Sequence, residues 1–263
     1  IIDEVGQPYM IQNQEIFVTI SIGAAFAPTD GDNAELLLKR ADIAMYCAKE
    51  KGRNTAIVFD DSMDNRSEMR LVLESALRHA VEREQLRVYY QPQNDPRSGA
   101  IIGTEALVRW QHPELGIIAP GEFLSIAQET GFITEIDNWV LCTACKDARA
   151  WSQSNLSTVR ISVNLSHHSF HAPNLIERVD AALESSGLPP ELLQLELTEE
   201  IVMVNQERSL HQMKAFRERG IRLSIDDFGT GYSSLGQLKN CPIDEVKIDR
   251  SFIRDITVDE SDS

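Results

Sequence analysis

Groups that could bind a cation or hydrogen-bond to a ligand occur near the ends of five apolar segments of the sequence. They are Glu105, Asn164, Glu196, Asp226 and Lys247. Aliphatic residues occupy alternate positions in most of these segments, and because strand side chains alternate between two faces, the polar groups lie on the face opposite the aliphatic ones. If the strands are parallel neighbours, all five groups meet where the strands end, which is where active sites form in parallel sheets.

This set of side chains points to metal-assisted chemistry. Three carboxylates and an amide oxygen form an oxygen-rich ligand set, which suits Mg²⁺ or Mn²⁺ better than zinc. Asp227 directly follows Asp226 and could reach a second ion, and paired divalent cations are a usual means of activating water for phosphodiester cleavage. Lys247 could orient that water or neutralise developing charge. Each group alone has a commoner explanation as a cap or a solvated residue, but their convergence favours a site.

The elements that would position these groups alternate along the chain. The pattern predicts strands near 87–91, 101–110, 159–165, 192–198, 221–226 and 245–248, and helices near 120–129, 135–152, 172–186 and 206–219. Such alternation predicts a parallel sheet with helical crossovers, an α/β fold.

The first 83 residues have a different organisation. A strand over 16–25, a helix over 33–50 and a strand over 55–59 are predicted, and they are too few to form a core of their own. A charged helix over 60–83 follows as a connector, with an apolar stripe that is predicted to include Met69, Leu73, Leu77 and Ala80.

Six short motifs, in one order, resemble those of the EAL family. They are Tyr89–Pro92, Glu105–Trp110, Val163–Ser166, Glu196–Glu199, Asp226–Gly231 and Lys247–Asp249. Together they cover about residues 84–256 and are highly specific as a set. The resemblance implies a TIM-like (β/α)8 barrel whose first strand is reversed. It also implies hydrolysis of cyclic di-GMP to linear pGpG with two divalent cations, Mg²⁺ or Mn²⁺, and inhibition by Ca²⁺.

The resemblance also assigns roles to individual residues. It implies that the first metal is held by Glu105, Asn164, Glu196 and Asp226, and the second by Asp227. Glu105, Asp227 and Lys247 correspond to residues with catalytic roles. Gln91, Leu107 and Arg109 correspond to ligand-binding positions, where the planar guanidinium of Arg109 can bind two phosphate oxygens. Glu199 corresponds to the anchor of the loop from Asp227 to Ser234, in which Gly229 and Gly231 allow a tight path. A homodimer formed through this domain is also implied.

The beginning of the chain has a separate resemblance. The segments Val18–Gly23, Arg40–Tyr46, Ala48–Lys49 and Gly52–Asn54 look like the last third of a GGDEF domain. The loop that carries cyclase chemistry in that family is not among these residues, so we expect no diguanylate cyclase activity from this chain. The predicted organisation is therefore 1–59 as the C-terminal part of a GGDEF domain, 60–83 as a linker helix and 84–263 as an EAL domain.

The EAL resemblance stops short of the family's full pattern. After Lys247 the family continues with two further strands, which carry a catalytic glutamate and a ligand-binding glutamine. We therefore expect this chain to be an excerpt of a longer protein that lacks the last strand-helix units of the barrel. Such a polypeptide on its own is expected to be inactive, with Val246 and Ile248 exposed on an uncovered strand.

Charge and hydropathy exclude several classes of partner. The formal net charge of -16 and the pI of about 4.8 argue against a surface for nucleic-acid polymers, which are bound through Lys and Arg. The longest mainly apolar stretch, 16–27, is shorter than a membrane span. We expect a cytoplasmic location, although other regions of the parent protein could anchor it to a membrane.

Two further clusters attract attention but have simpler interpretations. Cys142 and Cys145 form a C-x-x-C on a predicted helix, and without a second pair they are interpreted as packed thiols rather than a zinc site. His167, His168 and His171 follow the Asn164 strand and are interpreted as a solvated loop or the start of a helix.

Three functions remain open at the level of sequence. The favoured hypothesis is a metal-dependent cyclic di-GMP phosphodiesterase. The alternative is a catalytically inactive receptor that binds cyclic di-GMP and signals through the 60–83 helix. A third possibility is a protein-interaction scaffold that binds no nucleotide.

Overall fold

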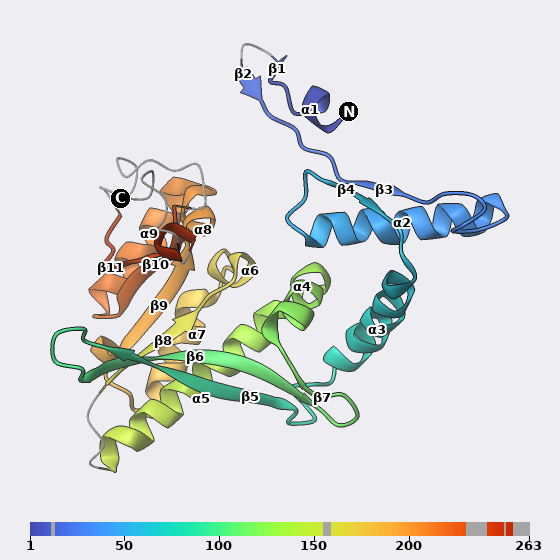
Figure 1. The fold of residues 1–263 in the computed structure, drawn as a ribbon. Coiled ribbons are helices and arrows are strands. Elements are labelled where there is room, and N and C mark those ends of the chain that lie inside the picture. The colour runs from blue at the N-terminus through green and yellow to red at the C-terminus, as the bar shows by residue number, and fades with distance from the viewer. Residues whose placement is uncertain (12–13, 155–158, 230–240, 250, 255–263) are drawn as a thin grey trace. The chain divides into compact units, whose positions relative to one another are not determined.

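The computed structural model describes residues 1–11, 14–154, 159–229, 241–249 and 251–254 (Figure 1). The chain divides into two compact units, Ile1–Ser75 and Ala76–Ser263. Each unit has its own sheets, and the boundary falls within the last turn of the helix over residues 61–77.

The first unit contains a helix packed on a small sheet. A short helix α1 (Ile2–Val5) precedes an antiparallel hairpin of β1 (Tyr9–Ile11) and β2 (Gln14–Ile16). Strand β3 (Ile22–Ala24) then pairs in parallel with β4 (Ala56–Val58), and α2 (Ala34–Glu50) connects them. The single strand predicted over 16–25 is wrong: residues 17–21 separate β2 from β3, and only three residues on each side form the β3–β4 ladder.

Local chemistry explains the position of α2. Its N-cap is Asn33, whose Oδ1 accepts a hydrogen bond from the Leu36 N–H at 2.9 Å. A side chain at Gly23 would lie 2.0 Å from the Ala41 carbonyl oxygen, so glycine is required where β3 passes directly over the helix. The core of this unit is a small group of buried side chains: Ile43, Ala44, Cys47, Phe59 and Met63.

Helix α3 (Asp61–Leu77) begins where the connector was predicted to begin. It ends earlier than predicted, because turns rather than helix occupy residues 78–84. Leu73, Leu77 and Ala80 are buried, as the predicted stripe requires, but Met69 is 41% exposed, and its inclusion in the stripe is wrong.

The second unit is built on one sheet of mainly parallel strands. The strands are β5 (Leu86–Asn94), β6 (Ile101–His112), β7 (Gly116–Ile118), β8 (Arg160–Asn164), β9 (Leu193–Thr198), β10 (Arg222–Phe228) and β11 (Glu245–Ile248). Their order is β11-β10-β9-β8-β6-β5, with β7 paired to β6. Strand β5 is antiparallel to β6, whereas β6, β8, β9, β10 and β11 are parallel to one another. The predicted strands and the reversal of the first one are confirmed.

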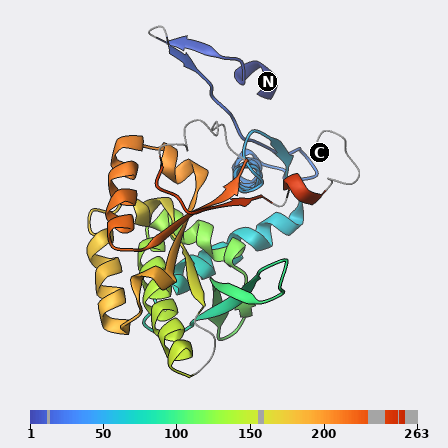
Figure 2. The same cartoon turned by 90° about the vertical axis from the view of Figure 1, so that its left-hand side faces the viewer.

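Helices connect the parallel strands. They are α4 (Pro120–Thr130), α5 (Ile133–Gln153), α6 (His167–Phe170), α7 (Leu175–Ser186), α8 (Glu199–Met203), α9 (Gln206–Glu218) and α11 (Ser251–Arg254), with a 3₁₀ turn at Pro190–Leu192. Figure 2 shows α5, α7 and α9 beside one another in yellow-green, gold and orange, and their contacts with β8, β10 and each other place them on the sheet's outer face.

The core of the second unit lies between these helices and the sheet. The outward side chains of the central strands are completely buried: Ile161, Val163, Leu193, Leu195, Leu197, Leu223 and Ile225. Burying each such side chain contributes roughly 1.5–3 kcal/mol. On α5, Cys145 is buried, and burial raises the pKa of its thiol to about 12. A thiol of this kind packs as a small apolar group, as the sequence predicted.

The two edge strands of this sheet determine whether the predicted barrel closes. Within the described ranges, β5 and β11 end the strand order, so closure into eight strands remains a prediction. The outward side chains of β11 are exposed, Val246 at 39% and Ile248 at 60%, as expected.

Candidate metal and active site

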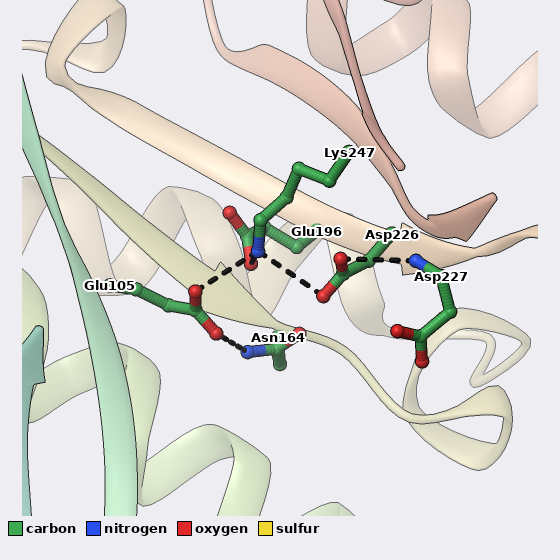
Figure 3. Close-up of polar contacts among 6 residues, drawn as sticks. All are labelled: Glu105, Asn164, Glu196, Asp226, Asp227 and Lys247. Atoms are coloured by element: carbon green, nitrogen blue, oxygen red, sulfur yellow. Dashed lines mark hydrogen bonds and ion pairs between the residues drawn. The ribbon is translucent and has the colours of Figure 1, made fainter. Parts of the chain in front are cut away.

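Neighbouring strands of the second unit bring the predicted polar groups together (Figure 3). Glu105 comes from β6, Asn164 from the end of β8, Glu196 from β9, Asp226 from β10 and Lys247 from β11. The parallel register sets Asn164 opposite Glu196 and Ser224 opposite the same glutamate. Because these strands run in the same direction, their polar residues lie at similar heights on one face.

The Lys247 ammonium is at the centre of the site. Its Nζ lies 3.0 Å from Glu105 Oε2, 2.6 Å from Glu196 Oε2 and 3.2 Å from Asp226 Oδ2. Asn164 Nδ2 donates a hydrogen bond to Glu105 Oε1 at 2.9 Å. These contacts connect all five strands that the sequence singled out.

The same contacts show that the sheet is strongly curved. Three strands lie between β6 and β11, so in a flat sheet the two would be about 19 Å apart at the usual strand spacing. A lysine and a glutamate together cannot reach across that distance, yet Lys247 and Glu105 are in contact at 3.0 Å. The inner face is therefore concave, and the site lies within the curve.

Glu196 is the most buried member of the cluster. Its side chain is 0% exposed. Burial raises the pKa of Glu196 to about 7; the Lys247 ammonium opposes this shift, and the neighbouring Glu105 and Asp226 carboxylates add to it. Burial alone would lower the pKa of Lys247, but the Glu196 and Glu105 carboxylates outweigh burial and raise it. One ammonium thus faces three carboxylates, which leaves an excess of negative charge.

The site fits a divalent cation. Glu105, Glu196 and Asp226 each offer an oxygen, and these oxygens all lie within 4.8 Å of one another. Glu196 Oε1 is buried and has no hydrogen-bond partner within the described part of the chain, although buried polar atoms are normally paired. The Lys247 nitrogen, itself a cation in contact with all three carboxylates, marks a position where positive charge is stabilised.

The other two predicted ligands lie at the margin of this three-carboxylate group. Asn164 presents its amide nitrogen to Glu105, so metal ligation requires its oxygen to turn inward. Asp227 has a left-handed backbone with φ of 52°, and its N–H donates to Asp226 Oδ1 at 3.0 Å. Burial and the adjacent Asp226 carboxylate raise the pKa of Asp227.

The predicted ligand-binding residues lie on β5 and β6. Gln91 is directly opposite Glu105 in the antiparallel register, and Leu107 is opposite Tyr89. The Arg109 guanidinium lies over the Tyr89 ring, 5.8 Å from its centroid. Tyr89 is 49% exposed and was missed by the sequence reasoning. The signal was present, because Tyr89 is two residues from Gln91 and therefore on the same face.

Glu199 makes the contact that a loop anchor needs. It is buried, and its Oε2 accepts a hydrogen bond from the Gly229 N–H at 3.2 Å. Gly229 has φ of 101°, and a side chain there would lie 2.6 Å from the Phe252 ring, so glycine is required. The rest of the predicted loop, Gly231 included, lies outside the described residues.

His167 and His168 begin the short helix α6, as one of the two interpretations predicted, whereas His171 follows its last residue. Ser166 caps α6, accepting from the Ser169 N–H at 3.2 Å, and its own N–H donates to Asp137 Oδ2 at 3.0 Å. The rings of His167 and His171 meet edge to face, with centroids 4.5 Å apart and an interplanar angle of 61°. The metal-binding group found among the described residues contains no histidine.

None of the helices in the described ranges is both long enough and apolar enough to cross a membrane.

Known protein families match both parts of the chain. The model of the EAL domain matches residues 74–263, and that of the GGDEF domain of diguanylate cyclases matches residues 1–55. The first match covers the whole of the second unit, including all residues of the candidate site.

Individual proteins show the same likeness. The chain is 42% identical over 263 residues to the bifunctional diguanylate cyclase/cyclic di-GMP phosphodiesterase MucR of Pseudomonas aeruginosa, covering 100% of this chain but 38% of that protein. It is 37% identical over 262 residues to the cyclic di-GMP phosphodiesterase NbdA of the same organism, covering 100% of this chain and 34% of that protein. A solved structure described as the PaMucR phosphodiesterase in complex with c-di-GMP superposes with a TM-score of 0.69 at 44% identity, over 72% of this chain and 77% of that one.

Proposed function

Because the chain belongs to the EAL family, we propose that it is part of a phosphodiesterase that hydrolyses cyclic di-GMP to linear pGpG. The observation that carries this proposal is the three-carboxylate group of Glu105, Glu196 and Asp226, gathered from three strands around a positive charge. The relatives named above support the choice of substrate. Since the chain spans 38% of MucR, activity is proposed for the whole protein of which these residues are a part.

The carboxylates would hold the metal ions. Glu105, Glu196 and Asp226, joined by Asn164, would bind the first cation, and Asp227 would bind the second. Mg²⁺ or Mn²⁺ bound in this way supplies an activated water and neutralises phosphate charge, and Ca²⁺ is proposed to bind without supporting turnover. The excess of carboxylates over ammonium groups at the site supports this ligand set.

The remaining site residues would act on the substrate directly. Lys247, among the carboxylates, would orient the attacking water and stabilise charge on the phosphate. Arg109 would bind a phosphate through two of its nitrogens, and Gln91 and Leu107 on the same curved face would contact the nucleotide. Glu199 would hold the loop after Asp227 in place through its contact with Gly229.

The proposal extends to the architecture of the whole domain. The curved sheet is consistent with part of a (β/α)8 barrel, which two further strands would close. We propose residues 84–263 as the EAL portion, 60–83 as a linker and 1–59 as the end of a GGDEF domain that supplies no cyclase chemistry within this chain. A homodimer through the EAL domain completes the proposal.

Turnover in the full-length protein tests this function. Glu105→Ala should abolish Mg²⁺-dependent production of pGpG, because it removes one of the three clustered carboxylates. Asp180→Asn is a matched control: it also removes one carboxylate, but from a partly exposed ion pair with Arg219 on the outer helices, and turnover should be retained. Undiminished turnover in Glu105→Ala would sink the proposal.

Calorimetry with cyclic di-GMP and Ca²⁺ separates the alternatives. Binding without any turnover in Mg²⁺ or Mn²⁺ would identify a receptor, and the absence of binding would identify a scaffold. The receptor is the weaker hypothesis, because binding alone does not require Glu105, Asn164, Glu196, Asp226 and Lys247 all to be present.

A further inference from the structure

A second polar layer lies beneath the candidate site on the same inner face of the sheet. Arg160 precedes Asn164 by four residues on β8, Gln194 precedes Glu196 by two on β9, and Glu245 precedes Lys247 by two on β11. Even spacing along a strand keeps side chains on one face. Each of these strands therefore carries a further polar residue on the same face as the group that it contributes to the site, two steps before it on β8 and one step before it on β9 and β11.

Members of this layer are bonded to one another across the concave face. Arg160 Nη1 donates to Gln194 Oε1 at 3.0 Å and forms an ion pair with Glu245 Oε2 at 3.3 Å. The Arg160 side chain is only 18% exposed. Because β9 and β10 lie between β8 and β11, this ion pair connects strands that have no backbone hydrogen bonds to each other.

The ion pair lies next to an irregularity in the β10–β11 ladder. Strand β11 pairs with β10 at Glu245 and Val246, but the register shifts before Ile248 pairs with Phe228. Lys247 lies at this irregularity, so the ladder alone does not fix its position. The side chain of Glu245, about 7 Å away along the strand, provides an additional constraint.

The layer is also too polar to be a simple packing layer. Ser162 Oγ, Ser224 Oγ and Gln194 Nε2 are buried and have no hydrogen-bond partner within the described ranges. Branched aliphatic residues usually fill the interior of parallel barrels, and buried polar groups cost free energy unless they are paired. Ordered water in this layer would satisfy these atoms.

We propose that Arg160 and Glu245 are positioning residues, whose ion pair fixes β11 and thereby places the Lys247 ammonium among the three carboxylates. The inference deepens the proposed function and rests on it only for the effect on turnover. Arg160 and Glu245 themselves do not touch the three carboxylates in any contact described above.

Charge exchange in the full-length protein tests the pair. Arg160→Glu and Glu245→Arg are made singly and together; in the double variant Gln194 Nε2 can donate to the new carboxylate. Two properties are measured: the rate at which acetic anhydride labels Lys247 in the metal-free protein, read by peptide mass spectrometry, and the affinity for Mn²⁺ alone by calorimetry. Arg219→Gln, which breaks the partly exposed pair with Asp180, is the control.

Each single variant should label faster at Lys247 and bind Mn²⁺ several-fold more tightly, because an ammonium that is held less firmly competes less with the added cation for the three carboxylates. The double variant should recover both properties, and Arg219→Gln should change neither. Unchanged labelling in a folded single variant, or a double variant as altered as the singles, would overturn the proposal.

Glu245→Gln decides the matter if the charge reversals prevent folding. It keeps an oxygen for Arg160 but removes the charge, so a smaller increase in Lys247 labelling is expected, and no increase would overturn the proposal. Because labelling needs neither metal nor substrate, a wild-type protein without hydrolytic activity would refute the proposed function while leaving this result intact.

Discussion

The two faces of strands β8, β9 and β10 carry opposite chemistry at adjacent residues. On the outer face Val163, Leu195 and Ile225 are completely buried against helices, whereas on the inner face Asn164, Glu196 and Asp226 point into the curve of the sheet. Burial of the outer face supplies the stability, and that stability is what permits uncompensated carboxylates to be held close together on the inner face. The comparison implies that substitutions on the inner face reduce turnover, whereas substitutions on the outer face reduce the free energy of unfolding.

Glu196→Gln should produce the largest effect, and on activity alone. It keeps the shape of the side chain but removes a proposed metal ligand, so cyclic di-GMP turnover should fall at least about 1,000-fold. The free energy of unfolding should change by no more than about 1 kcal/mol, because the substitution also removes a buried charge. Turnover assays and urea unfolding of the same sample measure both, and a large loss of stability would break the comparison.

Leu195→Ala, one residue away, should do the reverse. It leaves a cavity in the outer core, and the free energy of unfolding should fall by about 2–5 kcal/mol. Molecules that remain folded at low temperature should keep their turnover number. Ile117→Ala is the control, since that side chain is 62% exposed, and denaturant unfolding should detect little change.

Asp244 lies in the connection between β10 and β11 and belongs to neither face of the sheet. Its substitution therefore tests a contribution to stability that is separate from both faces. It forms an ion pair with Arg217 and accepts the Leu223 N–H at 2.9 Å. Burial alone would raise the pKa of Asp244, but these two donors hold it below its usual value. Asp244→Asn should therefore lower the free energy of unfolding by about 1–2 kcal/mol near neutral pH.

The pH dependence of that loss has a defined sign. Because the folded-state pKa is depressed, the carboxylate stabilises the fold above its unfolded value of about 3.8 and stops doing so as the pH falls through the folded-state value. Urea titrations of wild type and Asp244→Asn should converge below that range. A constant difference down to the lowest pH would show that the ion pair is not the cause.

Ser224→Ala should have the smallest effect and sharpen the account of the inner face. Its hydroxyl is buried without a partner in the described residues, so its removal costs no protein hydrogen bond, and stability should stay within about 1 kcal/mol of wild type or rise slightly. Thermal unfolding measures this, and a clear loss would indicate that a bound water holds the hydroxyl.

Alternation in the sequence was sufficient to predict the central strands. Leu193, Leu195 and Leu197 separate Glu196 and Thr198 so regularly that β9 was placed to within one residue. The 16–25 segment is equally apolar, yet it is broken, because a strand also needs a partner and β4 offers only three residues. Short elements such as β7 and α8 contain too few residues for a period to be recognised.

Contacts between distant residues were beyond such patterns. The strand face and the position along the strand of Lys247 and Glu105 predicted that the two share a site. They did not predict that the Lys247 ammonium contacts three carboxylates. The Arg160–Glu245 pair, 85 positions apart, depends on the curvature of the sheet, which no local spacing encodes. Motif resemblance identified the residues of the upper layer and was silent about the layer beneath.

The left-handed backbone at Asp227 has a consequence for how this position can vary. With φ of 52°, most residue types at this position destabilise the fold by about 1 kcal/mol. Glycine has no such cost, and the cost for asparagine or aspartate is small. In a library that contains all twenty amino acids at position 227, selection for thermal stability should enrich glycine and asparagine. Selection for cyclic di-GMP turnover should retain aspartate. The difference between the two rankings would measure how much conformational stability the protein loses by keeping a carboxylate at residue 227.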